Sequence, residues 1–324
     1  MLDKSEKIWK GSESQAIIGS QKIEISDKPY KLVWYDDFEG DKVDLSKWSG
    51  NGSGCGDASM VCTDKKGYWD VENSVGTITM TKSKEPDEKG KQILNGYSFV
   101  TTNTMNFQYG YLEMRAKIPF YGKGEFPAFW LLSSQAQLVR RKPDYKAKPF
   151  RIEVDIFESF SSKGTVVPNL HKYENKEGGL HCQLSGIDQG ASTSGTRSYT
   201  FPEGVEPNDW HNYGMLWTDK FMSFSVDGEF YYTYDLSEDF GNVSGMSGFH
   251  QPVGIIISNQ VFSERYCKDN PWGQKYGPAS DEIFPLKYHV DYVRLFQRED
   301  LGELLLGNEE DFKTVFNPGD GKLY

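Results

Sequence analysis

Short runs of β-branched and aromatic residues, each bounded by turn residues, constrain the fold of this chain more than any other feature. Between residues 31 and 297 such runs recur at close intervals, as expected for strands separated by tight turns. In residues 111–118 apolar and charged residues alternate, so that Leu112 and Met114 share one face. Helical periodicity is scarce, and its best candidate is residues 298–307. The pattern predicts an all-β protein, either a sandwich or a barrel.

The distribution of these runs indicates one domain with a flanking segment at each end. Residues 1–30 are polar and weakly patterned, and we expect them to form an N-terminal leader segment. Residues 31–298 carry the strand-like runs and are predicted to form the main domain, with residues 299–324 as a C-terminal appendage. A chain of 324 residues can bury a sizeable core, and 15% aromatic residues leave rings for a binding surface as well.

The charge and the apolar content exclude several classes of partner. A net charge of -11 argues against nucleic acid and against an anionic membrane surface, because both attract a basic protein face. The chain has no apolar run of about 18 residues that could span a bilayer. Its first residues lack the apolar core of a signal peptide. We expect a secreted or cell-surface protein whose signal peptide is absent from this chain, and a cytoplasmic location stays open.

The four cysteines are too few to build a disulfide scaffold, and their spacing does not suggest a zinc site. Cys55 and Cys62 are close enough in sequence to close a small loop by a disulfide, and free thiols are the alternative. The other two are Cys182 and Cys267.

Three carboxylates lie within one strand-like run, "RIEVDIFES" at residues 151–159. In a regular strand Glu153 and Asp155 share a face, whereas Glu158 points to the opposite one. That arrangement would bury an unpaired glutamate, which is costly unless the side chain loses its charge. A β-bulge at Ile156–Phe157 removes the conflict, because one extra residue returns Glu158 to the face of the other two acids.

Three acids on one face are the arrangement that a double-displacement glycosidase uses. With the bulge counted as one position, the two glutamates are roughly 13 Å apart along the backbone. Side chains that lean toward each other bring the carboxyls to about 5–6 Å, and retaining glycosidases need about 5–5.5 Å. Asp155 would lie between them and help to set which carboxyl holds a proton. Solvated acids scattered along a strand are the alternative interpretation.

Six stretches follow one another in an order that is typical of one enzyme family. They are "LVWYDDFEGDKVDLSKW", "QYGYLEMRAKIP", "GEFPAFWLL", "IEVDIFE", "WHNYGMLWTDKFMSFSVDG" and "YHVDYVRLFQ". Together they resemble glycoside hydrolase family sixteen over roughly residues 31–298, and "IEVDIFE" resembles its E-x-D-x-x-E signature in the bulged-strand form. The family includes laminarinases, agarases, κ-carrageenases and endo-β-galactosidases. The resemblance implies a β-jelly-roll sandwich of two curved antiparallel sheets with a concave substrate cleft.

The resemblance also implies a role for each acid. Glu153 would be the nucleophile, Glu158 the general acid/base, and Asp155 the carboxylate that orients and tunes the pair. The acid/base must start protonated, so its pKa must lie above that of the nucleophile. This chemistry needs no cofactor.

Trp130 matches the family tryptophan beside the cleavage point, where a sugar ring would stack on the indole, and a core position is the alternative. His171 follows the catalytic strand and would hydrogen-bond a sugar on the leaving-group side, unless it is structural. The remaining candidates for substrate contact are Phe126, Tyr97, Asn95, Glu113 and Arg115. Phe126 stands where many relatives have a tryptophan, and Glu113 and Arg115 form either a cleft-side pair or a solvated one.

Many members of the family hold a structural calcium ion away from the cleft. Glu39 and Asp291 match its ligand positions, and the region of Gly76 would add a backbone carbonyl. Hard oxygen ligands suit calcium, so the resemblance implies a possible structural calcium site there.

Departures from the family pattern bear on the substrate. Residues 133–151 form a basic insertion, which could recognise an acidic substituent or be a solvated loop. The leading hypothesis is a monomeric, retaining endo-β-glycanase that acts on β-1,3- or mixed β-1,3/1,4-glucan polysaccharides or oligosaccharides. An endo-β-galactosidase is the first alternative, and a non-catalytic carbohydrate-binding jelly roll is the alternative from another class.

Overall fold

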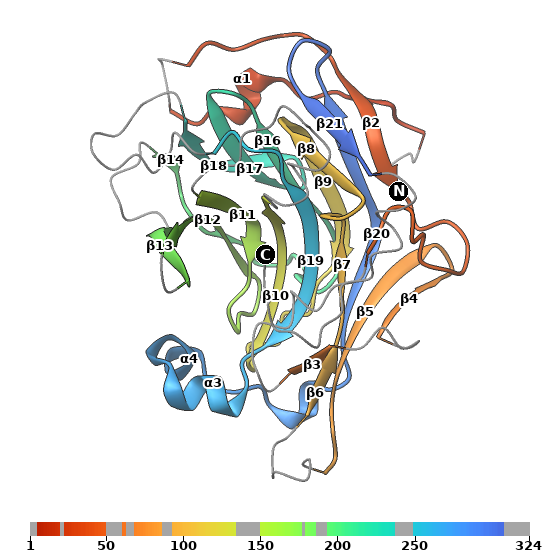
Figure 1. The fold of residues 1–324 in the computed structure, drawn as a ribbon, viewed down its shortest axis with the longest axis vertical. Helices are drawn as coiled ribbons and strands as arrows, with labels where there is room; N and C mark the ends of the chain where they lie inside the picture. The colour runs from red at the N-terminus through yellow and green to blue at the C-terminus, as the bar shows by residue number, and fades with distance from the viewer. Residues whose placement is uncertain are drawn as a thin grey trace.

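Two sheets packed face to face make up the body of the protein (Figure 1). The computed structural model describes residues 5–19, 23–49, 60–62, 68–85, 93–133, 150–176, 179–185, 193–236 and 249–307. Within these residues strands predominate, and paired strands run antiparallel except for one parallel pair at a sheet edge. The prediction of an all-β sandwich is confirmed.

The outer sheet is the larger of the two. Its strands lie in the order β14 (Thr193–Gly195), β18 (Glu229–Asp235), β17 (Phe221–Val226), β16 (Trp210–Trp217), β9 (Gly110–Lys117), β20 (Leu286–Gln297), β5 (Val75–Lys82), β6 (Leu94–Gly96) and β3 (Met60–Cys62). Three further strands attach beside this path: β1 (Ile8–Trp9), β2 (Tyr30–Asp36) and β4 (Trp69–Glu72).

The inner sheet carries the strand with the three acids. Its order is β13 (Gly179–Ser185), β12 (Thr165–Lys176), β11 (Phe150–Glu158), β10 (Glu125–Leu132), β19 (Gly254–Val261) and β7 (Ser98–Val100). A short strand, β15 (Tyr199–Thr200), pairs with the beginning of β12. The acid-bearing strand therefore lies inside the sheet, with a paired neighbour on each side.

The hydrophobic core fills the space between the two sheets because alternate residues of both point inward. Leu112 and Met114 of β9 are fully buried there, as the alternation of residues 111–118 predicts. Leu131 of β10 and Val154 of β11 meet them from the inner sheet. The opposite face of each strand is therefore available for polar side chains.

The hairpin between β17 and β18 turns at Asp227 and Gly228. Both residues have positive φ angles, 51° and 81°, as a two-residue turn with the twist of the flanking strands requires. The Asp227 carboxylate lies 2.7 Å from Nδ1 of His211 on β16 and also accepts a hydrogen bond from the backbone N–H of Asn212. The turn is thus tied to the adjacent strand.

The prediction of a helix at residues 298–307 is wrong. Glu303–Leu306 form strand β21, which pairs antiparallel with β8 (Met105–Gln108). Pairing with a strand distant in sequence overrides the weak helical pattern of this leucine-rich run.

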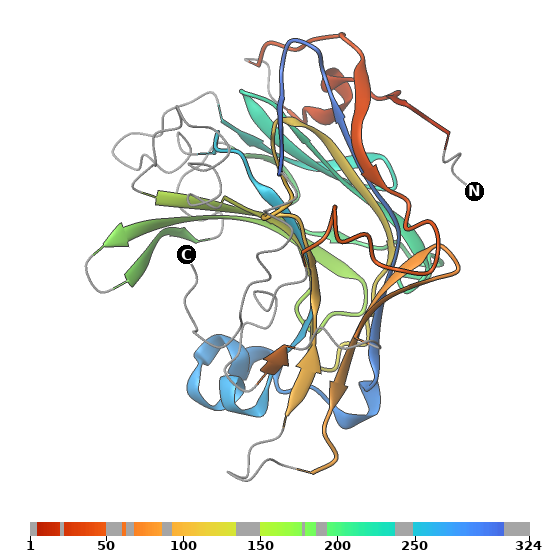
Figure 2. The same cartoon turned by 45° about the vertical axis from the view of Figure 1, so that its right-hand side comes forward.

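The main helical elements lie in the chain between β19 and β20. Helix α3 (Glu264–Asp269) begins after Ser263, whose hydroxyl accepts from the backbone N–H of Tyr266. Helix α4 (Pro271–Tyr276) begins after Asn270, whose side chain accepts from the backbone N–H of Trp272. A 3-10 turn, η3 (Asp281–Ile283), follows. Figure 2 shows α3 and α4 on the side of the inner sheet that faces away from the outer sheet.

None of the helices in the described part of the chain is long and apolar enough to cross a membrane.

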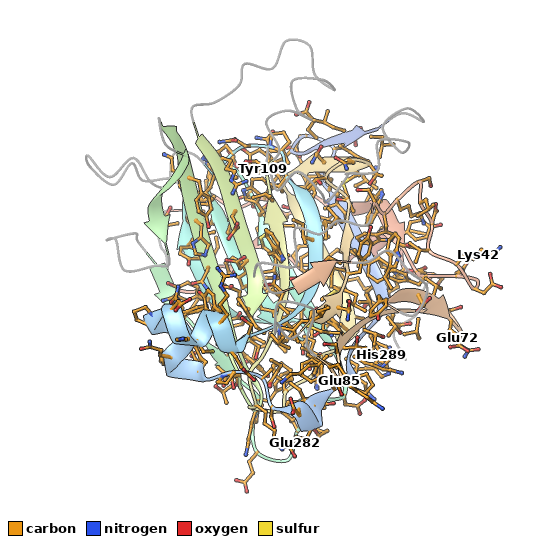
Figure 3. The ribbon with its side chains drawn as sticks, turned by 60° about the horizontal axis from the view of Figure 1, so that its bottom comes forward. Lys42, Glu72, Glu85, Tyr109, Glu282 and His289 are labelled. Carbon is orange, nitrogen blue, oxygen red and sulfur yellow. The ribbon has the colours of Figure 1, made fainter. Side chains whose placement is uncertain are left out.

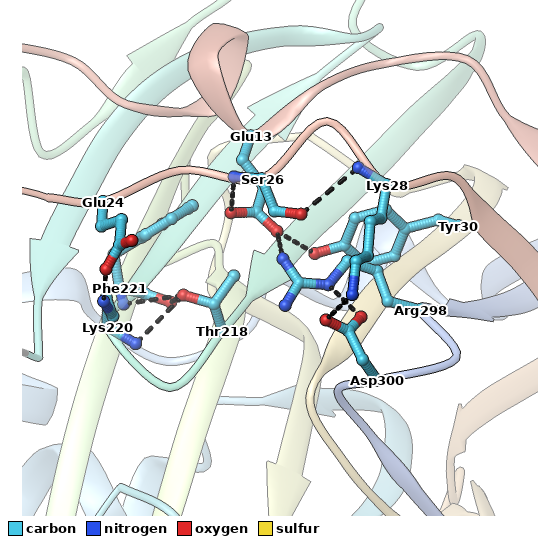
Figure 4. A network of polar contacts seen from close by, with 10 residues as sticks. All are labelled: Glu13, Glu24, Ser26, Lys28, Tyr30, Thr218, Lys220, Phe221, Arg298 and Asp300. Atoms are coloured by element: carbon cyan, nitrogen blue, oxygen red, sulfur yellow. Dashed lines mark hydrogen bonds and ion pairs between the residues drawn. The ribbon is translucent and has the colours of Figure 1, made fainter.

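The N-terminal segment is bound to the main domain rather than separate from it. Strand β1 pairs with β2, and the short helix α1 (Glu13–Ala16) lies against the outer sheet, where the hydroxyls of Ser223 and Thr233 donate to the carbonyl of Ala16. The carboxylate of Glu13, 2% exposed, accepts from Tyr30, Ser26 and Arg298 (Figure 4). The predicted leader therefore covers part of the outer sheet.

Candidate active site

Strand β11 contains a β-bulge at the predicted position. Asp155 pairs with Asn169 of β12, and Glu158 pairs with Val167, so Ile156–Phe157 stand opposite a single residue. The pairing with β10 shifts at the same point. A bulge adds one residue to one strand, which reverses the alternation of side chains beyond it.

The bulge directs both of its residues into the core. Ile156 and Phe157 are buried in the cluster between the sheets, beside Val154 of the same strand. Glu153 and Glu158 are only partly buried and lie on the opposite face, together with Asp155. We call this side of the inner sheet the carboxylate face. The prediction that a bulge gathers the three acids on one face is confirmed.

His171 of β12 supplies a positive charge next to two of the acids. It pairs in register with Glu153, and its Nε2 lies 3.1 Å from Oδ2 of Asp155 and 3.9 Å from Oε1 of Glu153. Burial opposes a charged imidazole, but the hydrogen bond and charge of Asp155, aided by both glutamates, raise the pKa of His171 to about 10. The imidazolium therefore partly compensates the cluster of carboxylates.

Three groups around Glu153 favour its ionised form, but burial and a neighbouring charge outweigh them. Burial and the charge of Asp155 raise its pKa to about 7, whereas His171, Arg151 and the Tyr173 hydroxyl act in the opposite direction. The Tyr173 hydroxyl donates to Oε1 at 3.4 Å, and the Arg151 guanidinium lies 5.0 Å from the centre of the Tyr173 ring. A carboxylate with this surrounding suits a nucleophile.

The surroundings of Glu158 also disfavour its ionised form. Burial, followed by the charge of Asp155, raises its pKa well above the usual range, against the effects of His171 and Asn169. The Asn169 amide donates to Oε2 of Glu158, and the amide oxygen of Asn169 accepts from Arg197. The raised pKa favours the protonated form of Glu158, as a general acid requires.

The sequence analysis did not identify three of these groups, Asn169, Tyr173 and Arg197. Asn169 and Tyr173 lie two positions on either side of His171 in a strand, so period-two alternation places them on the same face. That pattern could have identified both. No local sequence pattern points to Arg197, because it reaches the site from a separate segment.

Trp130 of β10 lies on the carboxylate face rather than in the core. It pairs in register with Asp155, its ring is partly exposed, and its Nε1 donates to Oγ of Ser258 at 3.0 Å. The hydrogen bond fixes the orientation of the indole next to the acids. This geometry is what a sugar-stacking platform requires.

Phe126 belongs to an aromatic cluster beyond the end of β11. The backbone N–H of Ser161 donates to the carbonyl of Glu125, so the β10–β11 pairing continues past Glu158 and brings Phe160 and Phe126 to a centroid distance of 5.0 Å. The cluster also contains Phe262 of the chain after β19, Tyr266 of α3, and Trp272 and Tyr276 of α4. Contacts between aromatic side chains thus hold helices α3 and α4 against the carboxylate face.

Asn95 and Tyr97 lie further from the acids. Asn95 is on β6 of the outer sheet, and Tyr97, which is buried against Trp69 at 4.8 Å, lies just before β7 of the inner sheet. Two strands, β19 and β10, separate β7 from β11. Their role in substrate contact stays a prediction.

The assignment of Glu113 and Arg115 to the substrate cleft is corrected. Both lie on β9 of the outer sheet, on the face opposite to the core and away from β11. Glu113 accepts from the hydroxyls of Tyr111 and Tyr292. Because Leu112 and Met114 of the same strand fill the core, the alternating charged residues must face outward.

An open groove of about 650 Å³ lies on this outer face. Glu72, Trp210 and His289 line it, and the side-chain view in Figure 3 labels Glu72 and His289. Arg115 borders the groove, with its guanidinium 5.1 Å from the Trp210 ring and 2.6 Å from the carboxylate of Asp291. The outer face thus carries its own polar network, separate from the three acids.

One of the two predicted calcium ligands already has a cationic partner. Asp291 pairs with Arg115 at 2.6 Å, so its charge is already compensated. In the described chain, the group of acidic, His or Cys residues that could hold a metal is Glu153, Asp155 and His171, which does not include Glu39. A structural calcium at Glu39 and Asp291 stays a prediction.

Two predictions concern residues whose structure is not described. Most of the basic insertion at residues 133–151 lies outside the described ranges, and so does Cys55, the partner proposed for Cys62. Cys267 is a buried free thiol.

A sandwich that presents two glutamates and an aspartate on one face, with the pKa of both glutamates raised, is typical of a glycoside hydrolase. The chain belongs to the glycosyl hydrolases family 16, whose family model matches residues 57–277. The resemblance found in the sequence is thereby confirmed, and the fold is the jelly roll of that family.

Related proteins support the same placement. A beta-glucanase from Rhodothermus marinus is 26% identical over 87% of this chain and 90% of its own length. A glucan endo-1,3-beta-glucosidase A1 from Niallia circulans is 24% identical over 83% of this chain, which spans only 38% of that protein. A beta-1,3-glucan-binding protein from Penaeus monodon is 28% identical over 59% of this chain and 46% of its own length.

Among solved structures, the laminarinase catalytic domain of Thermotoga maritima superposes with a TM-score of 0.61 at 23% identity. The match covers 83% of this chain and 98% of that domain, which shows a shared fold.

Proposed function

We propose that the protein is a retaining endo-β-glycanase that cleaves internal bonds of β-1,3- or mixed β-1,3/1,4-glucan. The observation that carries the proposal is the bulge in β11, which places Glu153, Asp155 and Glu158 on one face beside His171. A protein that only binds glycans has no use for two neighbouring glutamates with raised pKa values. The names of the relatives support glucan as the substrate.

In the first step, an oxygen of Glu153 attacks the anomeric carbon while Glu158 gives its proton to the departing glycosidic oxygen. The carbon–oxygen bond to the leaving sugar breaks, and a glycosyl ester of Glu153 forms. In the second step, Glu158, now ionised, takes a proton from water, and the water oxygen displaces Glu153. His171 lies between Asp155 and Glu153, and its positive charge stabilises Glu153 whenever that carboxylate is ionised.

Two alternatives remain distinct from this proposal. An endo-β-galactosidase would use the same acids on a β-galactoside glycan. A non-catalytic glucan binder has a counterpart in the relative from Penaeus monodon. The paired acids favour catalysis over binding alone, and the glucan-named relatives favour glucan over galactan.

Release of reducing ends from laminarin, lichenan and agarose distinguishes the three functional hypotheses. We expect reducing ends from laminarin or lichenan, with oligosaccharides as early products because cleavage is internal. Hydrolysis of agarose alone would favour the endo-β-galactosidase. Laminarin binding in a sedimentation assay without any hydrolysis would overturn the proposal in favour of a binding protein.

We further propose that Trp272 of α4 contacts the bound glycan. Its side chain is 37% exposed, and its ring lies edge-on to Phe160 at 4.6 Å, two residues beyond Glu158. An exposed indole next to the carboxylate face offers a flat apolar surface to the C–H face of a sugar ring.

The Trp272→Ala change is expected to weaken binding of a β-1,3-glucan oligosaccharide about fivefold or more, because a stacked ring contributes about 1 kcal/mol. The dissociation constant is measured by calorimetry in the Glu153→Gln background, so that no substrate is consumed. Tyr35→Ala, which removes an exposed ring from β2 of the outer sheet, is the matched control. Equal affinities of the two variants would contradict the contact.

A polysaccharide substrate favours a protein that acts outside the cell, and we propose a secreted or cell-surface location. We also propose a monomer, since one chain carries all three acids of the site.

A further inference from the structure

A chain of polar contacts links Glu158 of β11 to Arg197, which lies on a separate segment of the chain. The Nδ2 group of Asn169 on β12 donates to Oε2 of Glu158, and the Oδ1 atom of Asn169 accepts from Nη2 of Arg197. Arg197 lies between β14, an edge strand of the outer sheet, and β15, which pairs with β12. Three residues from separate segments thus meet at the candidate acid/base.

The chemistry of arginine determines which way the Asn169 amide points. A guanidinium can donate hydrogen bonds but cannot accept them. The oxygen of the amide must therefore face Arg197, and its NH₂ group must face Glu158. Without Arg197 either orientation of the amide would be available, since an amide can turn its oxygen toward a protonated carboxyl instead.

The orientation matters because Glu158 changes its protonation twice in each catalytic cycle. An N–H group that donates to a carboxyl favours the ionised form. Asp155 and Glu153 oppose ionisation of Glu158 through their charges, and so does burial, while His171 supports it. Asn169 is therefore one of few groups that help Glu158 to act as a base.

We propose that Arg197 is a positioning residue, which holds the Asn169 amide so that its NH₂ group always donates to Glu158. The arrangement stabilises the ionised carboxylate that must take a proton from water in the second step. This inference rests on the proposed function, because it takes Glu158 as the acid/base. Arg197 itself need not touch the substrate.

Replacing Arg197 by methionine tests the inference, because methionine has similar length and offers no donor. We expect the alkaline limb of kcat/KM for laminarin oligosaccharides to move upward by about one pH unit, since a hydrogen bond to a charged group is of that strength. The Arg197→Lys variant still donates and should keep the wild-type limb. If the alkaline limb of kcat/KM in the Arg197→Met variant stays at the wild-type pH, the inference is overturned.

A double variant separates positioning from the direct effect of the arginine charge. In the Asn169→Leu background, Arg197→Met should cause no further shift of the limb, because no amide is left to orient. A shift as large as in the wild-type background would show that Arg197 acts by its charge alone, which contradicts the proposal.

Titration of the Glu158 carboxyl by carbon-13 NMR gives a readout that does not need activity. The resonance is assigned by its loss in the Glu158→Gln variant, and its titration midpoint should rise in Arg197→Met and not in Arg197→Lys. An unchanged midpoint would refute the positioning role. Failure of the wild-type protein to hydrolyse any glycan would instead refute the proposed function and leave this midpoint test valid.

Discussion

Glu153→Gln and Glu158→Gln are each expected to reduce glucan hydrolysis by about a thousandfold or more, with the fold intact. Glutamine keeps the size of the side chain but can neither form the glycosyl ester nor transfer a proton, and each of these functions is worth orders of magnitude in rate. Reducing-end release from laminarin gives the rates, and circular dichroism checks the fold.

The matched control is Glu113→Gln, which makes the same chemical change on the outer sheet. Its two carboxylate oxygens accept from Tyr111 and Tyr292; in glutamine the oxygen can accept from one hydroxyl, and the NH₂ group can donate to the oxygen of the other. The control should keep near-wild-type activity. Near-wild-type turnover by either inner-sheet variant would show that the catalytic assignment is wrong.

Rescue by azide distinguishes the two roles. With an activated aryl glycoside, azide can attack from the side vacated in Glu153→Gly and yield the α-glycosyl azide. In Glu158→Gly, azide can attack the glycosyl ester of Glu153 and yield the β-glycosyl azide, by a second inversion. The reverse pattern of products would exchange the nucleophile and the acid/base.

The second large effect concerns stability, and it has the opposite sign from the loss of activity. Glu153→Gln is expected to stabilise the protein at pH 8 by about 1 to 3 kcal/mol. Burial raises the folded-state pKa of Glu153 from its usual 4.5 to about 7, so the folded protein binds this proton more tightly than the unfolded chain does. Stability is then lost as the pH rises from about 4.5 to about 7, and glutamine removes that loss.

Urea unfolding at pH 4.5 and pH 8 measures the effect. The variant and the wild type should have similar free energies of unfolding at pH 4.5, where the carboxyl is protonated in the folded state and still half protonated in the unfolded chain. The free energy of unfolding of the variant should exceed that of the wild type only at pH 8. The difference is reduced because His171 ionises more weakly once Glu153 is replaced by a neutral side chain. A gain of equal size at both pH values, or a loss at pH 8, would contradict the raised pKa.

Much of the site could be predicted because the sequence of β11 has only one reasonable fit to a sheet. Its apolar residues require one face in the core, and Glu158 fits that requirement only with an extra residue at Ile156–Phe157. The alternation of apolar and charged residues also predicted which face of β9 lies in the core. It could not reveal that β9 belongs to the outer sheet, so Glu113 and Arg115 stayed candidates for the substrate cleft beside the alternative of a solvated pair.

The features that escaped prediction depend on contacts between distant segments. Strand β21 exists because it pairs with β8, and Arg197 reaches Asn169 only because the chain before β15 packs beside β12. Helices α3 and α4 were also missed, although Ser263 and the pair Asn270-Pro271 are typical residues at helix N-termini. Each of the two helices spans only six residues, too few for helical periodicity to appear.

The anomeric form of the first product tests the central claim, that the bulge in β11 makes Glu153 and Glu158 a double-displacement pair. Proton NMR follows the anomeric signals of reducing ends during the first minutes of laminarin oligosaccharide hydrolysis, before mutarotation. The β-anomer should appear first and the α-anomer only as mutarotation proceeds, because two inversions restore the configuration. Initial formation of the α-anomer from this β-linked substrate would contradict the mechanism.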